Sequence, residues 1–141
     1  MKVNVTINPS NVSGYLNIDA SSGGDIGGFG GIVSDSEAVE ILATDIINFV
    51  PYDKIEDLID EWIKKLRHGG RLVIGGVDAS EVCRAVTQTS MSIEDFNQIV
   101  HNGRASQMCI SKLSEILSNK GLNILKKRLS GFNMIVEAQR P

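Results

Sequence analysis

The sequence predicts an α/β fold with a mostly parallel central sheet that ends in an antiparallel hairpin. Three observations support this. Residues 38–77 read as strand, amphipathic helix and strand, the order of a βαβ unit. Gly69-Gly70 leaves very few residues between that helix and the second strand, which is typical of a right-handed parallel crossover. Two strand-like segments around Ser130-Gly131 have the spacing of a hairpin.

Two short strands are expected at the start of the chain. Residues 2–7 alternate apolar and polar side chains and are rich in β-branched residues, and Asn8-Pro9 then interrupts them. Residues 14–19 read as a second strand that ends on Asp19. The connection is too short for a crossover helix between parallel neighbours. The two strands therefore either form a hairpin or are joined by an irregular crossover loop.

A glycine-rich segment follows at residues 21–31, with six glycines in eleven residues. Such a composition predicts a loop. It also allows a phosphate cradle, because glycine lets backbone N–H groups approach oxygen atoms closely. Neither G-x-G-x-x-G nor G-x-x-x-x-G-K-[ST] occurs here, so the loop is the favoured interpretation.

The central unit has the clearest signals. Residues 38–43 form an apolar run that suits a strand buried on both faces, and Thr44 and Asp45 follow at its carboxyl end. Pro51 fits the first turn of the next helix, and Gly69-Gly70 is expected to end it. Apolar residues with helical spacing define one face of this helix: Ile55, Leu58, Ile59, Trp62 and Leu66. Residues 71–74 then return as a strand.

The rest of the chain predicts three helices and the closing hairpin. The first helix covers residues 79–87, and the second begins at Ser92, with Asp95 placed as in a capping box. Ser111 is expected to cap the third helix, which Gly121 ends. Strands at residues 122–129 and 132–138 follow. Since there is neither a repeat nor a long linker, we expect one domain over residues 1–141.

Composition narrows the function classes. The 141 residues are 42% apolar and 22% charged, with a net charge of −3, which is ordinary for a globular protein. The sequence has no long basic block, so we expect no stable nucleic-acid binding. No apolar run is long enough to span a membrane, and residues 1–10 lack the apolar region of a signal peptide, so a cytoplasmic location is expected. No metal-ligand spacing occurs, and a homodimer is possible.

Several short sequence motifs, in their order along the chain, resemble those of class I S-adenosylmethionine-dependent methyltransferases, in a compact, Rossmann-like branch of that family. Residues 49–53 (FVPYD), 61–62 (EW) and 66–74 (LRHGGRLVI) are similar to the segment from the end of the fourth strand to the fifth. Residues 14–19 resemble the branch's G-Y-x-N-x-D segment. The resemblance implies a three-layer α/β/α methyltransferase fold in which the first helix is reduced.

The same resemblance implies a cofactor site for S-adenosylmethionine outside the carboxyl ends of the strands. Asp19 matches the acid that binds the ribose hydroxyls, and Ala20 lies beside the adenine. Thr44 and Asp45 match the site after the fourth strand, where Asp45 is the candidate general base. The first-strand loop corresponds to Thr6, Ile7 and Asn8. This loop departs from the family's L-N-L-G-C-G motif, because Thr6 and Asn8 occupy the positions at which that motif has glycine.

Three functions remain open at this point. The first is methyl transfer from S-adenosylmethionine to an unknown acceptor. The second is a non-catalytic binding or scaffolding protein on the same fold, with a decayed cofactor site. The third is another nucleotide-binding α/β domain, which rests only on the general position of ligand sites in open α/β sheets.

Overall fold

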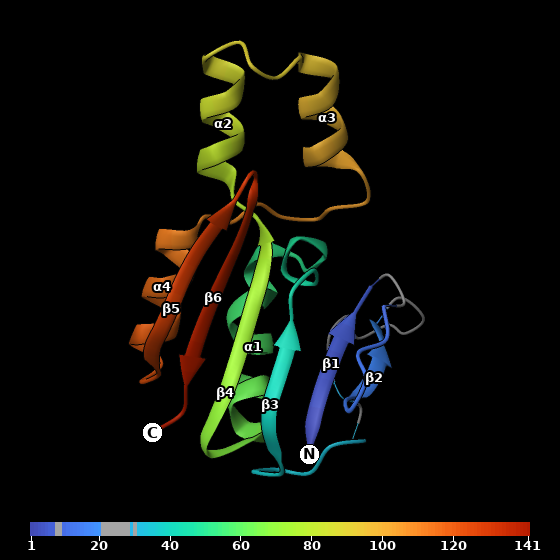
Figure 1. The fold of residues 1–141 in the computed structure, drawn as a ribbon, viewed down its shortest axis with the longest axis vertical. Helices are drawn as coiled ribbons and strands as arrows, with labels where there is room; N and C mark the ends of the chain where they lie inside the picture. The colour runs from blue at the N-terminus through green and yellow to red at the C-terminus, as the bar shows by residue number, and fades with distance from the viewer. Residues whose placement is uncertain (8–9, 21–28, 30) are drawn as a thin grey trace.

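A computed structural model describes residues 1–7, 10–20, 29 and 31–141 of the chain. Six strands form one sheet in the order β2-β1-β3-β4-β6-β5 (Figure 1). β1, β2, β3 and β4 are parallel, whereas β6 runs antiparallel to both β4 and β5. The expected mostly parallel sheet with an antiparallel C-terminal hairpin is thus confirmed. The strands are β1 Lys2–Thr6, β2 Leu16–Asp19, β3 Ala38–Ala43, β4 Leu66–Val77, β5 Asn123–Ser130 and β6 Asn133–Gln139.

The first two strands are parallel neighbours, which decides between the two connections left open by the sequence. Val3 pairs with Leu16, and Thr6 pairs with Asp19. The described residues between the strands contain no helix, in agreement with a reduced first helix. Asn4 on β1 stabilises this short crossover, because its Nδ2 atom lies 2.9 Å from the carbonyl oxygen of Ser10.

The central βαβ unit forms in the expected order, but both ends of its helix differ from the prediction. Pro51 does not lie in the first turn of the α-helix: it precedes a short 3-10 helix at Tyr52–Lys54, and the α-helix begins only at Ile55. β3 occupies the expected residues, and α1 (Ile55–Lys65) buries its apolar face against the sheet. Gly69-Gly70 does not end α1, since Leu66 is already extended and begins β4. Ala38 pairs with Leu66 but Glu40 pairs with Arg71, so β4 carries a bulge here. Gly69 allows this bulge through its φ of +80°.

Three more helices follow: α2 (Ala79–Thr87), α3 (Ile93–His101) and α4 (Ile110–Asn119). The expected cap of α3 is confirmed, because the Ser92 hydroxyl accepts a hydrogen bond from the backbone N–H of Asp95. The prediction that Ser111 caps α4 is wrong. The N-cap position is Cys109, and the N–H of Ile110 donates to the Oδ1 atom of Asp78 at 2.7 Å.

Asp78 is a buried carboxylate that serves two helices. Its Oδ2 atom accepts a hydrogen bond from the N–H of Glu81 at 2.9 Å and so caps α2. Its Oδ1 atom accepts from Ile110 at the start of α4. The side chain is 1% exposed. The Asp78 side chain therefore connects the first turn of α2 to the first turn of α4.

The helices α1 and α4 cover the same face of the sheet (Figure 1). On the opposite face the described residues contribute no helix, so the second helical layer of the expected α/β/α arrangement is not seen among them. A polar network lies there instead. Glu40 accepts hydrogen bonds from the Tyr15 hydroxyl and from Nε and Nη2 of Arg71, the latter two at 3.1 and 2.5 Å. Glu137 lies 3.6 Å from Arg71.

The helices α2 and α3 stand beyond the carboxyl end of β4, away from the main core (Figure 1). They have a small apolar cluster of their own, formed by Val77, Val82, Ala85 and Met91. None of the helices in the described parts of the chain combines the length and apolar character that a membrane crossing requires.

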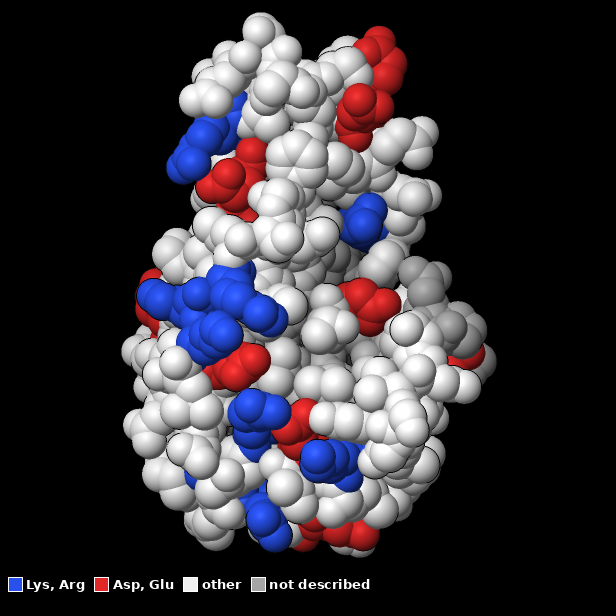
Figure 2. Space-filling view, viewed as in Figure 1, with Lys and Arg blue, Asp and Glu red and all other residues white. Residues whose placement is uncertain are grey.

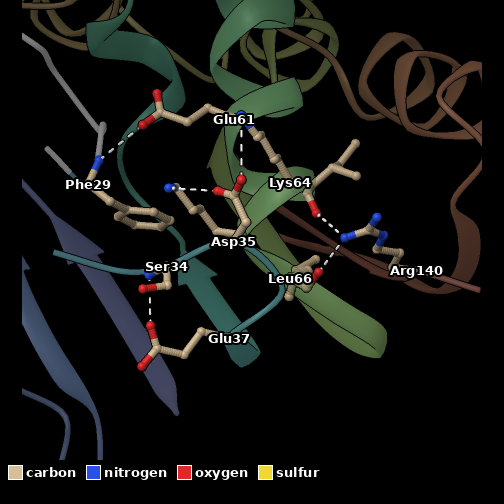
Figure 3. A network of polar contacts seen from close by, with 10 residues as sticks. Phe29, Ser34, Asp35, Glu37, Glu61, Lys64, Leu66 and Arg140 are labelled. Carbon is tan, nitrogen blue, oxygen red and sulfur yellow. Dashed lines mark hydrogen bonds and ion pairs between the residues drawn. The ribbon is translucent and has the colours of Figure 1, made fainter. Parts of the chain in front are cut away.

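Polar contacts fasten the segment before β3 to α1 (Figure 3). Asp35 lies 3.5 Å from Lys64 and 3.0 Å from Lys65, in the last turn of the helix. The buried Phe29 donates its N–H to Glu61 at 3.4 Å. Near the end of the chain, Arg140 donates to backbone carbonyl groups at the junction of α1 and β4, which holds the bulge in place.

Candidate functional site

The strand order places a topological switch point between β1 and β3. β2 lies on one side of β1 and β3 on the other, so the crevice between the two connections opens at the carboxyl ends of these strands. Ligands of open α/β sheets bind at such a point. The predicted site residues of the described chain, Thr6, Ile7, Asp19, Ala20, Thr44 and Asp45, all end or directly follow β1, β2 or β3. Asn8 lies outside the described residues.

A hydrogen bond crosses the switch point. The Thr6 hydroxyl at the end of β1 donates to the Oδ2 atom of Asp45 after β3, at 3.0 Å. Thr6 is buried, with 5% of its surface exposed. The Oδ1 atom of Asp45 is also buried and has no hydrogen-bond partner among the described residues. A buried carboxylate oxygen without a donor is costly, so this atom marks a place where a ligand donor would be stabilised.

The end of β2 is exposed to solvent, in contrast to the buried end of β1. Asp19 is exposed there, and it stands directly beside Thr6 in the ladder. The next residue, Ala20, is 5% exposed and belongs to the main core. A solvent-accessible carboxylate next to a small buried side chain can accept hydrogen bonds from a diol while a flat ring packs beside it. Thr44 is exposed and Ile7 is half-buried at the same edge.

These residues fit the two halves of S-adenosylmethionine unequally. Asp19 and Ala20 suit the ribose and adenine that the resemblance assigns to them. Thr6 stands where the family has glycine, and its hydroxyl already binds Asp45. Its Cβ substituents fill space that glycine would leave open to a close backbone contact. The residues present therefore match the adenosine half of the resemblance, whereas Thr6 differs from the family at the position that faces the methionine half.

Asn48 joins three segments near the carboxyl ends of β3 and β4 and was not singled out from the sequence. Its Oδ1 atom accepts the N–H of Val77 at 2.8 Å, and its Nδ2 atom donates to the carbonyl of Ser106 at 3.2 Å. Its own carbonyl accepts from the N–H groups of Ala105 and Ser106. The side chain is 3% exposed. Asn48 thus ties the turn after β3 to the end of β4 and to the loop after α3.

Two sequence features could have indicated this role. Asn48 is the single polar residue in the apolar run of residues 46–50. Gly76 lies close by, and a Cβ atom there would stand 2.6 Å from the Oδ1 atom of Asn48. The close approach of the two segments therefore requires glycine at this position of β4.

The loop that Asn48 holds brings a cation to the turn after β3. Arg104 lies 5.5 Å above the ring centroid of Phe49 and donates from Nη1 to the carbonyl of Ile99 at 2.8 Å. Its Nε atom is buried and has no partner among the described residues. The guanidinium group therefore has hydrogen-bonding capacity left over on the side of the sheet where the ligand site is expected.

A separate hollow of about 400 Å³ lies between α2 and α4. Both cysteines of the chain line it, together with Tyr52 and Lys112. Hydrogen bonds from Ser111 and from the backbone N–H of Lys112 lower the pKa of the Cys109 thiol. In the described ranges, His, Cys, Asp and Glu side chains form no group of three or more that could hold a metal ion.

Neither a family model nor a curated protein matches the sequence. Solved structures do match. A methyltransferase from Thermotoga maritima, described as SAM-dependent and a possible histamine N-methyltransferase, is 17% identical over 90% of this chain and 63% of its own, with a TM-score of 0.55. Magnesium protoporphyrin IX methyltransferase from Synechocystis, with bound SAH, is 13% identical over 90% of this chain and 51% of its own, with a TM-score of 0.56.

An O-methyltransferase family protein from Burkholderia thailandensis is 16% identical over 73% of this chain, with a TM-score of 0.54. The chain spans only 30% of that protein and less than two thirds of the other two. At these identities the likeness concerns the fold. The sheet order and the structural matches together show that this chain has a class I methyltransferase-like fold.

Proposed function

We propose that the chain binds S-adenosylmethionine at the carboxyl ends of β1, β2 and β3 and transfers its methyl group to an acceptor. The observation that carries the proposal is the convergence of Asp19, Thr6 and Asp45 on the switch point of a methyltransferase-like sheet. The cofactor, when bound, supplies the electrophilic methyl group. The chain's own residues bind the cofactor, orient the acceptor and accept a proton.

Each predicted residue has a task in this proposal. Asp19 accepts hydrogen bonds from the ribose hydroxyls, and Ala20 leaves room for the adenine. Asp45 has one buried oxygen without a donor, which suits a group that accepts a hydrogen bond or a proton from a ligand. Thr44 is exposed at the same edge and can contact the acceptor.

The bond between Thr6 and Asp45 favours a second candidate, a non-catalytic binding or scaffolding protein on the same fold. In that case the side chain of Thr6 replaces part of the cofactor, and Asp45 serves only to hold β1 against the turn after β3. The adenosine side, with Asp19, is unaffected by this bond. The two candidates therefore differ in whether the methionine half of the cofactor is admitted.

Calorimetric titration with S-adenosylmethionine, S-adenosylhomocysteine and adenosine tests the proposal. Wild-type protein should bind all three. Asp19→Asn should weaken binding by about 10- to 100-fold, because hydrogen bonds to a charged acceptor contribute about 1.5–3 kcal/mol. Asp57→Asn, an exposed acid on α1, is the matched control and should leave the affinity unchanged.

Thr6→Gly separates the two candidates. If methyl transfer is the function, the variant binds S-adenosylmethionine as well as or better than wild type, and both bind it more tightly than adenosine. If the cofactor site has decayed, wild type binds S-adenosylmethionine no more tightly than adenosine, whereas Thr6→Gly binds S-adenosylmethionine more tightly than adenosine. Absence of binding by both proteins at millimolar ligand would refute the methyltransferase proposal.

A further inference from the structure

The strand β5 forms one edge of the sheet and is exposed along most of its length. Among the described residues β5 pairs with β6 alone, so the backbone N–H and C=O groups on its outer side have no ladder partner in that part of the chain. All of residues 125–130 are exposed. An edge of this kind can accept a further strand from another chain.

Three consecutive cations occupy this edge: Lys126, Lys127 and Arg128. None of them forms an ion pair with an acid of the described chain. Glu137, which faces Lys126 across the ladder, lies near Arg71 instead. Figure 2 shows Lys and Arg side chains gathered in the region where Figure 1 places β5. The sign of this patch is opposite to the net charge of the chain, which is −3.

Lysine on an edge strand often serves only to prevent aggregation. Here the cations are flanked by two exposed apolar side chains, Leu125 at 51% and Leu129 at 48% exposure. A hollow of about 530 Å³ also lies at the end of the hairpin, lined by Arg128, Leu129 and Ile135 among others. Exposed leucines and a hollow do not protect an edge. They are features of a surface that receives side chains.

Charge decides which partner this edge can take. If β5 paired with β5 of a second copy, three cations would meet three cations, and like charges opposite each other destabilise a ladder. An acidic strand instead places carboxylates beside Lys126, Lys127 and Arg128. We propose that the outer edge of β5 binds an extended acidic segment of a partner protein, which adds a strand to the sheet. This proposal does not depend on the methyltransferase activity.

The test is a fluorescence-anisotropy titration of the full chain with a labelled ten-residue peptide of alternating Glu and Val. We expect saturable binding that weakens as salt is added. The double variant Lys126→Glu/Arg128→Glu should weaken binding at least tenfold and should bind a peptide of alternating Lys and Val. Lys54→Glu, which reverses an exposed cation away from β5, is the control and should bind the acidic peptide as wild type does.

A second peptide tests strand addition itself. It has the same charges, but alternate backbone nitrogens are methylated so that it cannot complete a ladder. We expect it to bind at least tenfold more weakly. Equal binding of the methylated peptide, or stronger binding of a single-stranded RNA of equal charge, would overturn the proposal in favour of a general polyanion surface. Unchanged binding by the double variant would overturn it as well.

Discussion

Replacing Asn48 with alanine should destabilise the fold more than any exposed polar substitution. The substitution removes the acceptor of the Val77 N–H and the donor to the Ser106 carbonyl. Both backbone groups then remain beneath the turn after β3 without a side-chain partner, because Asn48 is 3% exposed. Alanine is too small to fill the space, and its side chain can neither donate nor accept a hydrogen bond.

The expected cost follows from these two groups. Leaving a buried polar group without a partner costs about 1–3 kcal/mol, so the loss of partners for two groups in Asn48→Ala should lower the free energy of unfolding by about 2–6 kcal/mol. For a chain of this length each kcal/mol lowers the melting temperature by about 3 °C, which gives a fall of about 6–18 °C. Asn48→Asp keeps an acceptor for Val77 but loses the donor to Ser106, so it should also destabilise.

Urea unfolding followed by circular dichroism measures the effect. The control is Asn97→Ala, since Asn97 is an exposed residue of α3 that makes one hydrogen bond to its own helix. The m-value should stay the same in all variants, so that the midpoint reports stability. If Asn48→Ala and Asn97→Ala differ by less than about 0.5 kcal/mol, the role assigned to Asn48 is refuted.

Further predictions concern pH, helix capping and thiol chemistry. Burial raises the pKa of Glu40, but hydrogen bonds from Tyr15 and Arg71 outweigh it, so the net pKa is lowered. The ionised Glu40 therefore stabilises the fold above about pH 4.5, and this contribution is lost as pH falls through the folded-state pKa of Glu40. The hydrogen bond to Glu40 raises the pKa of Tyr15, so its contribution is lost as pH rises above about 10. The free energy of unfolding, plotted against pH, should therefore change less for Glu40→Gln than for wild type at both the acidic and the alkaline end of the range. Asp78→Ala should cost about 2–4 kcal/mol in urea unfolding, because two helix starts lose an acceptor; a loss under 1 kcal/mol would contradict the double cap. Ser111→Ala should slow alkylation of Cys109 by iodoacetamide at pH 7, since Ser111 lowers the pKa of that thiol, and the other cysteine should react at its former rate.

Elements with strong local signals were predictable from the sequence. The bounds of β3 and α2 agree with the predicted ranges, because an apolar run and an amphipathic segment each carry their own signal. The junction after α1 was not predictable in the same way. The bulge at Gly69 depends on pairing with β3 and on the carbonyl group of Arg140, which accepts the Gly69 N–H at 2.7 Å. Such distant partners leave no local pattern.

The same distinction applies to the candidate site. The sequence places Asp19 and Asp45 at strand ends, and the parallel order brings those ends to one edge. The bond between Thr6 and Asp45 joins residues far apart in the chain, so only the folded sheet reveals it. The hydrogen bonds of Asn48 also depend on a loop more than fifty residues away in the sequence. Sequence patterns identify which side chains stand at the edge, whereas tertiary contacts determine which of them are already engaged.

The role of Asp45 can be separated from its contribution to stability by a substitution that keeps its shape. Asp45→Asn retains an oxygen that accepts the Thr6 hydroxyl and replaces the buried, unpartnered Oδ1 atom with an amide nitrogen. Because one uncompensated polar atom replaces another, stability should change by about 1 kcal/mol or less.

An amide cannot accept a proton, so an enzyme that uses Asp45 as its general base should lose methyl transfer while its affinity for S-adenosylhomocysteine stays the same. Asp45→Ala should instead reduce stability, because it removes the hydrogen bond that joins the end of β1 to the turn after β3. Calorimetry, urea unfolding and release of S-adenosylhomocysteine measure the three quantities. Equal methyl transfer by wild type and Asp45→Asn would remove Asp45 from the chemistry and leave it as the residue that holds β1 to the turn after β3.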